Sequence, residues 1–252
     1  MNSIFLLMLF GGGFVGGLYA STVGSVSLIS FPLVLLTGLP VHVAIATNRF
    51  ASIMLELASA AKYYQEKKLN LKLGLRFGAI AAVGALIGSN VVVNVDEKYL
   101  NLATSLLLVL VFLFFVFRNN LGLEEKKWNP RHWLMPSVAI FLLGIYGGFF
   151  GAGFGTFIST ILILLGFDFL KSAAMSRVVG LMMSVAATVV FAYNGLIHYP
   201  YAIVLGMGMA IGGWTGAGIG IEKGNRYIRS LFILVVLLTS AKLVWTGVAA
   251  TK

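Results

Sequence analysis

Two arginines and one glutamate lie inside long apolar segments of this chain. Arg49 and Glu56 share the segment 41–64, and Arg177 lies in the segment 170–193. Seven residues, or two helical turns, separate Arg49 from Glu56, which places both on nearly the same face of a helix. A guanidinium group matches an oxyanion through paired hydrogen bonds. We therefore predict that Arg49 and Arg177 form two cationic walls of a central anion site.

A glycine-rich run precedes each of these segments and can add backbone donors to the site. A helix that begins at a glycine break presents free N–H groups and partial positive charge to an anion. Glycines at Gly-xxx-Gly spacing are also common contact faces between membrane helices, and we assign this role to Gly13/Gly17 and Gly144/Gly148. The residues predicted to bind the anion at the breaks are Gly24, Ser25, Gly153, Gly155 and Thr156.

Glu56 is the most conspicuous acid in the chain, because it lies well inside an apolar segment. A charge near the centre of a membrane helix costs roughly 2.5–3.5 kcal/mol on insertion scales, so such a residue usually faces the protein interior. One hypothesis is that Glu56 takes up a proton coupled to transport. In the alternative, Glu56 is an internal counter-ion of Arg49, and both arginines extend to the membrane interface. Asp168 is predicted to cap the start of a helix.

The composition indicates that the chain folds in a membrane. Hydrophobic residues make up 59% of the chain, charged residues only 10%, and the mean hydropathy is +0.97, which leaves too little polar surface for a soluble globule. Backbone groups in a bilayer must be satisfied within each segment, so we predict helices. The net charge of +10 comes from loop residues that set topology, and it does not indicate nucleic-acid binding. Without cysteine there is no disulfide and no thiolate metal site.

The two halves of the chain repeat one another. Gly24 aligns with Gly155 at a shift of 131 positions, and, after a loss of three residues, Arg49 aligns with Arg177 at a shift of 128. The second segment of each half is shorter than the about 20 residues that a membrane span needs. We expect a broken or re-entrant helix there, opened at Pro32 and at the glycine breaks. The expected segments are 4–20, 24–38, 41–64, 71–93 and 99–117, then 134–150, 155–166, 170–193, 199–221 and 228–248.

Basic residues predict how the halves are oriented. Lys and Arg gather at residues 62–76, in the link between the halves and at 223–229, whereas the loops between them have almost none. Since basic loops stay in the cytoplasm, the halves are predicted to be inverted relative to one another, with both termini outside. Inverted repeats with interrupted segments are an architecture of secondary transporters. We predict an all-α polytopic membrane protein with about 8–10 transmembrane segments in a single domain, 1–252: repeat one at 1–118, a cytoplasmic link at 119–131 and repeat two at 132–252.

The motifs Ala46-Thr47-Asn48-Arg49 and Ala174-Met175-Ser176-Arg177, together with GGFFGAGFGT at 147–156, resemble those of the TauE/SafE family of membrane transporters. The resemblance covers essentially the whole chain. It implies a plasma-membrane transporter of small anions, often sulfur-containing, such as sulfite, thiosulfate, sulfonates or organic acids. The motif residues Thr47, Asn48 and Ser176 join the predicted substrate-binding residues.

Three other classes of protein compete with a carrier. An anion channel of the same architecture would conduct without saturating. A membrane-embedded enzyme needs a nucleophile with a base or a metal cluster, and the sequence has no HExxH, no GxSxG and no grouped histidines. A structural or assembly factor leaves the duplicated arginines unexplained. We therefore predict a non-enzymatic carrier that alternates its access between the two repeats and has no catalytic residue, no metal site and no cofactor. Its predicted partners are a small anion, the lipid bilayer and a coupling proton or ion.

Overall fold

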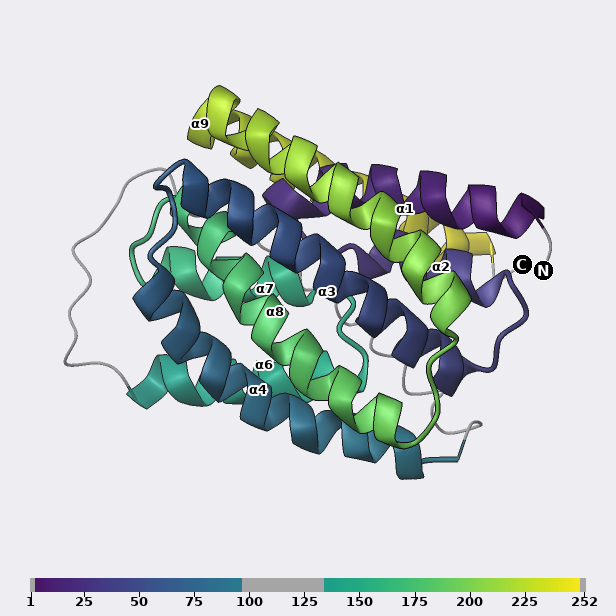
Figure 1. Ribbon diagram of the computed structural model, residues 1–252. Helices are drawn as coiled ribbons and strands as arrows, with labels where there is room; N and C mark the ends of the chain where they lie inside the picture. Colours follow the sequence, from purple (N-terminus) through teal and green to yellow (C-terminus); the bar gives the residue numbers. More distant parts are fainter. Residues whose placement is uncertain (1–2, 97–133, 250–252) are drawn as a thin grey trace.

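The computed structural model describes residues 3–96 and 134–249, and every regular element in that part of the chain is an α-helix (Figure 1). The expected segment 99–117 and the link 119–131 lie outside the described residues. The helices are α1 (Ser3–Val23), α2 (Ser27–Leu35), α3 (Val41–Gln65), α4 (Leu71–Asn94), α6 (Leu134–Phe149), α7 (Phe154–Leu164), α8 (Phe169–Tyr193) and α9 (Tyr199–Ala249).

Local signals in the sequence set where the helices begin. α4 starts after Asn70, whose side chain accepts a hydrogen bond from Leu73 N at 3.2 Å. Asp168 accepts one from Lys171 N at 2.7 Å, which confirms its predicted role as the N-cap of α8. α3 starts after Pro40, whose ring fixes φ near the value found here, −54°. The starts of these three helices lie within one residue of the starts expected from the apolar segments.

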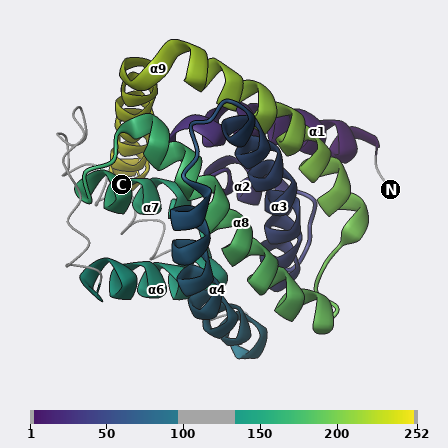
Figure 2. The ribbon, with the colours of Figure 1, turned by 60° about the vertical axis from the view of Figure 1, so that its left-hand side comes forward.

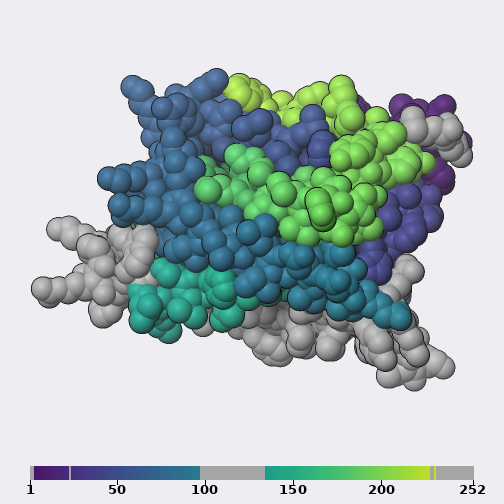
Figure 3. Space-filling model, turned by 60° about the horizontal axis from the view of Figure 1, so that its bottom comes forward, coloured from purple at the N-terminus to yellow at the C-terminus, as the bar shows by residue number. Residues whose placement is uncertain are grey.

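The helices pack in the spatial order α1, α9, α3, α8, α4, α6. α1 lies along α9 at the top of Figure 1, α4 lies along α6 at the bottom, and α3 and α8 lie between these two pairs. This order of contacts is the same when the two halves of the chain are exchanged. In that exchange α1 corresponds to α6, α3 to α8 and α4 to α9. The space-filling view shows one face of the molecule, on which α3, α8 and α4 lie next to one another (Figure 3).

α3 and α8 run antiparallel at the centre of the molecule. The last turn of α3 meets the first turn of α8, where Tyr63 and Phe169 share one apolar cluster. The first half of α3 meets the start of α9, since Phe50 packs edge-on against Tyr199 with ring centroids 5.6 Å apart. An antiparallel central pair is what inverted halves require. The inversion itself, in a membrane, stays a prediction.

Glycines allow the outer helix pairs to pack backbone to backbone. On α1, a Cβ added at Gly17 would lie 2.5 Å from Met209 O of α9. On α6, a Cβ at Gly148 would clash with Ala85 O of α4. Gly13 and Gly144 have equivalent surroundings. The predicted packing role of these four glycines is confirmed, because only a hydrogen fits at each contact.

The two short helices follow breaks of three or four residues. α2 has 9 residues and α7 has 11, so at 1.5 Å per residue they extend only about 14–17 Å, half the hydrocarbon thickness. The breaks lie at residues 24–26 and 150–153, where Gly151 and Gly153 adopt positive φ (74° and 79°). The expectation that Pro32 opens the backbone is wrong. Pro32 lies inside α2, and the chain opens before the helix instead.

Within the described residues, four helices are long and apolar enough to cross a membrane. α3 has 25 residues but is not among them, because its charged side chains lower its hydropathy. The expected segments 199–221 and 228–248 form one long helix, α9, interrupted at Gly224 (φ 72°), where the ribbon turns sharply (Figure 2). The protein is thus an all-α polytopic membrane protein. The four candidate spans are residues 3–22, 71–94, 169–193 and 199–227.

Candidate functional site

The two helix breaks meet at the centre of the molecule. Gly24 follows α1 and Gly155 lies in the first turn of α7, and a Cβ added to Gly155 would clash with the carbonyl oxygen of Gly24. A Cβ on Gly24 would lie 2.9 Å from Thr156 Oγ1. These glycines are equivalent in the two repeats, so the break of one half is packed directly on the break of the other.

Arg49 extends from α3 to the C-terminal end of α6. Its Nη2 donates to Gly147 O at 2.6 Å and to Phe150 O at 3.1 Å. The residue is only 3% exposed. The last carbonyls of a helix carry partial negative charge and have no partner within the helix, so a guanidinium stabilises them. Gly151 is needed here, because a Cβ at that position would clash with Arg49 Nη2.

Arg177 makes the matching contact in the other half. Its Nη2 donates to Gly24 O at 3.2 Å, just beyond α1, and it is 2% exposed. Its Nη1 lies 3.2 Å from Glu56 Oε2 on α3, in a contact that is an ion pair without hydrogen-bond geometry. Gly180 allows the approach, since a Cβ there would lie 2.7 Å from Glu56 Oε1. Each arginine thus binds the break of the opposite half.

The N-termini of the short helices add partial positive charge to this centre. In the described structure no side chain caps either α2 or α7. The first N–H groups of a helix have no partner within it and carry partial positive charge. Two buried guanidinium groups and two uncapped N-termini therefore converge where the breaks meet. Positive charge with N–H donors is the chemistry that binds an oxyanion.

Polar side chains hold the breaks in place. Ser25 Oγ donates to Gly151 O at 3.1 Å and joins the two breaks directly. Asn48 Nδ2 donates to Ser27 Oγ at 3.1 Å, and Ser30 donates to Asn48 Oδ1, so that Asn48 fixes α2 on α3. These bonds are buried. Buried side-chain pairs of this kind rigidify the backbone that they connect.

The structure brings most of the predicted site residues together. Gly24, Ser25, Gly155 and Thr156 lie at the meeting breaks, with Gly153 at the N-cap of α7. Ser176 accepts hydrogen bonds from Arg177 and supports it. Thr47 does not join this group through its hydroxyl, because Thr47 Oγ1 accepts from His198 N at 3.0 Å and ties α3 to the start of α9.

The structure contradicts one part of the alternative prediction for the charged residues and changes the other. The arginines do not extend to the membrane interface, since the protein buries them on carbonyl groups. The ion-pair partner of Glu56 is Arg177 across the α3–α8 contact, and not Arg49 on its own helix. The physical reason is that Gly180 leaves α8 open to the carboxylate at this point.

Sequence reasoning missed the groups that the arginines bind. Carbonyls of residues 147, 150 and 24 are backbone atoms, which no side-chain pattern announces. Gly151 lies in the quoted glycine run, yet its role depends on the position of Arg49. Tyr146 donates to Ala152 O and braces the same break. The sequence contains one signal for the role of Gly180. Gly180 occupies the repeat position of Ser52, and it lies four residues, about one helical turn, before Ser184, which is the repeat position of Glu56.

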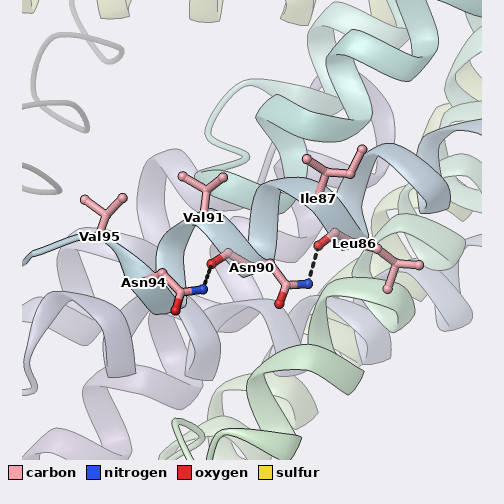
Figure 4. Close-up of a pocket in the computed structure, with 6 residues that line it drawn as sticks. All are labelled: Leu86, Ile87, Asn90, Val91, Asn94 and Val95. Atoms are coloured by element: carbon pink, nitrogen blue, oxygen red, sulfur yellow. Dashed lines mark hydrogen bonds between the residues drawn. The ribbon is translucent and has the colours of Figure 1, made fainter.

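Two described pockets lie away from the arginines. One is a groove of about 600 Å³ along the end of α4, lined by side chains of that helix and by Val95, which follows it (Figure 4). Its two amides, of Asn90 and Asn94, donate to carbonyls one turn earlier, Leu86 O and Asn90 O, at 2.7 Å. The other, of about 510 Å³, lies between α6 and α7. Neither is lined by a charged residue, so neither fits an anion site.

Comparison with known proteins extends these findings. The chain is 28% identical over 242 residues to a "Probable membrane transporter protein" of Haemophilus influenzae, which covers 95% of this chain and 94% of the relative. It is 26% identical to the "Probable membrane transporter protein ORF9" of a Sinorhizobium species (94% and 92% covered). It is 24% identical to the "Probable membrane transporter protein YfcA" of Escherichia coli (97% and 93% covered). No solved structure matches the chain.

The model of one protein family, described as sulfite exporter TauE/SafE, matches residues 9–243. This match covers nearly all of the two repeats, and it includes both helix breaks and both arginines. The helices that can cross a membrane lie within the same range, apart from the first residues of α1. The chain therefore belongs to the TauE/SafE family and is a multi-pass membrane transporter.

Proposed function

We propose that this protein is a secondary transporter that moves a small anion across the plasma membrane by alternating access between its two halves. The observation that carries the proposal is the convergence of the buried Arg49 and Arg177 on two breaks with uncapped helix N-termini. Fixed positive charge and the partial positive charge of two helix N-termini, enclosed by protein, favour an oxyanion. A cation would be repelled there.

The proposed substrate class is a sulfur-containing anion such as sulfite, thiosulfate or a sulfonate, or a small organic acid. The support is the description of the family, which refers to sulfite export. The names of the relatives refer to membrane transport and to no substrate. The site chemistry agrees with this class, because sulfur oxyanions and carboxylates both accept paired hydrogen bonds from a guanidinium.

The proposed mechanism uses the relation between the halves. Each arginine spans the interface, from the long helix of one half to the break of the other. A rocking motion of one half against the other would break one set of these contacts and leave the other intact. The guanidinium released from its carbonyls then presents its donors to the anion. This exchange links substrate binding to the change of access.

Binding of anions to the purified protein tests the proposal. An anion present at about 100 times its dissociation constant stabilises the native state by roughly 2.7 kcal/mol, which a thermal shift detects. The panel contains sulfite, thiosulfate, sulfate, sulfonates and small carboxylates. Arg49→Lys and Arg177→Lys keep the positive charge but lose the paired N–H donors of the guanidinium group, and both are expected to weaken anion binding. A protein that no anion stabilises, and that moves none in liposomes, would contradict the proposal.

Counterflow separates the proposed carrier from an anion channel of the same architecture. Liposomes are loaded with unlabelled anion, and uptake of a labelled trace is followed. A carrier exchanges the two and shows a transient overshoot with saturable rates, whereas a pore conducts down the gradient alone. A saturating, overshooting uptake is expected. Linear uptake with steady current would assign the protein to the channels.

Glu56 is the residue that we propose for proton coupling. Its carboxylate pairs with Arg177 at the centre of the molecule, so uptake of a proton there would release Arg177 and couple protonation to the rocking motion. Flux measured across a pH series should depend on pH in the native protein and lose that dependence in Glu56→Gln. An unchanged pH dependence in Glu56→Gln would exclude the proton role.

A further inference from the structure

Three charged side chains are buried at the centre, and their charges do not cancel. Glu56 lies 3.2 Å from Arg177 and neutralises it. Arg49 binds only the carbonyls of residues 147 and 150, and within the described part of the chain no carboxylate pairs with it. Its Nε is a buried donor that no described group accepts. The three groups together therefore carry one net positive charge, and Arg49 is the arginine that has no ion-pair partner among the described residues.

The repeat explains where the missing acid would be. Arg177 is the repeat counterpart of Arg49, and at the same shift of 128 positions Ser184 is the counterpart of Glu56. Ser184 is fully buried, and its hydroxyl has no partner among the described residues. The neighbouring Met183 lies beside Gly147, whose carbonyl binds Arg49. The second half thus has a small neutral side chain where the first half has its carboxylate.

We infer that Arg49 supplies the net positive charge of the anion site, because Glu56 neutralises Arg177, and that the transported species carries a single negative charge. This inference rests on the proposed function and narrows its substrate class to sulfonates and monocarboxylates. A buried charge must be compensated, since an uncompensated one is strongly destabilising away from water. While Glu56 is ionised, a dianion such as sulfate or thiosulfate brings one negative charge more than the site can neutralise. Ser184 is the residue that keeps the charge of Arg49 available.

The native protein gives the first test, and this test needs no variant. Methanesulfonate and sulfate present similar sulfur–oxygen geometry but differ in charge. Calorimetric titration of the purified protein at fixed pH should give binding of methanesulfonate at least about tenfold tighter than binding of sulfate. Sulfate binding that equals or exceeds methanesulfonate binding, or that takes up a proton from the buffer, would overturn the inference. The proposed function would still stand in that case, whereas a protein that binds and transports no anion of the whole panel would remove both.

A matched pair at position 184 tests the role of charge in that half. Ser184→Glu places an acid at the repeat position of Glu56, and should lower methanesulfonate affinity at least about tenfold. Ser184→Gln has the same shape without the charge and should retain affinity within a few-fold. Equal losses in both variants would overturn the role of Ser184.

Glu56→Gln should act in the opposite direction, because it removes the negative charge that neutralises Arg177. It should improve the binding of sulfate relative to that of methanesulfonate. If the ratio of sulfate affinity to methanesulfonate affinity is unchanged in Glu56→Gln, the inferred net charge of the site is wrong.

Discussion

Gly180 decides how closely the carboxylate of Glu56 approaches α8. A Cβ at position 180 would lie 2.7 Å from Glu56 Oε1, so Gly180→Ala should push the carboxylate away from Arg177. Weakening a buried polar contact of this kind costs about 1–3 kcal/mol. The expected result is a lower unfolding temperature of the purified protein, together with altered anion binding.

Two comparisons isolate the ion pair as the cause. Gly218→Ala is the control, because its Cβ would meet only Lys62 Cε at 3.4 Å, an ordinary contact. In a Glu56→Gln background the same change at Gly180 should cost less, because no ion pair remains to be weakened. An equal cost in both backgrounds would mean that Gly180 matters for packing alone.

The N-cap of α8 is a second prediction at the scale of one side chain. Asp168 accepts from Lys171 N, and removal of such a cap costs about 0.5–2 kcal/mol. Asp168→Ala should therefore lower the unfolding temperature, whereas Asp168→Asn, which keeps an acceptor oxygen, should preserve it. The same loss in Asp168→Asn would show that the charge, and not the cap, is what stabilises the helix.

The charged residues of the site were predictable from the sequence, but their partners were not. Arg49, Arg177 and Glu56 stand out because ionisable residues are expensive within apolar segments. Spacing along one helix suggested Arg49 as the partner of Glu56, whereas the structure pairs Glu56 with Arg177. A contact between helices depends on which side chains leave room for it. Gly180 carries that information only once α3 and α8 are placed together.

At the scale of the elements, close backbone contact between helices depends on glycines, whose side chain is a single hydrogen atom. A Cβ on Gly17 of α1 would lie 2.5 Å from the backbone of α9, and backbone cannot move aside as a flexible side chain can. Gly17→Ala should separate α1 from α9 and cost about 1–3 kcal/mol. Gly148→Ala should do the same to α6 and α4. Thermal unfolding of the purified variants measures both.

Gly11→Ala is the matched control for these helix contacts. Gly11 lies on α1, but no atom lies within 4 Å of a Cβ added there. Since Ala favours helix over Gly, this variant should be neutral or stabilising by up to about 1 kcal/mol. If Gly11→Ala and Gly17→Ala destabilise equally, glycine in α1 serves flexibility and not close packing.

The elements themselves were largely predictable, because apolar length and caps determine where membrane helices begin and end. α4 occupies 71–94 against the expected 71–93, and α8 occupies 169–193 against 170–193. The prediction at Pro32 failed because a proline usually interrupts a helix. Pro32 is the sixth residue of the nine-residue helix α2, where the missing N–H removes only one backbone hydrogen bond. The exact breaks needed the structure, since several glycines in each run compete for that role.

At the scale of the whole molecule, the basic loops gather at one end. The end of α3, the start of α8 and the break at Gly224 are joined there, and Leu170 N donates to Asn225 Oδ1 at 2.8 Å. Lys67, Lys68, Lys223 and Arg226 belong to this end. At the opposite end, His42 Nε2 contacts Val95 O at 2.9 Å, and Thr47 binds the backbone before α9. Basic loops at a common end favour one cytoplasmic face.

Single cysteines can test this orientation, because the chain contains no cysteine of its own. Lys68→Cys and Lys223→Cys place a thiol at exposed positions of the basic end, and Asp96→Cys and Asn194→Cys place one at exposed positions of the other end. In intact cells, a maleimide that does not cross membranes should label positions 96 and 194 alone, while inverted vesicles should give the reverse pattern. Labelling of positions 68 and 223 from opposite sides would contradict the arrangement of the two halves. Labelling of positions 68 and 223 from outside would keep that arrangement and reverse its orientation. In that case the Lys and Arg residues of the loops would not decide the topology of this transporter.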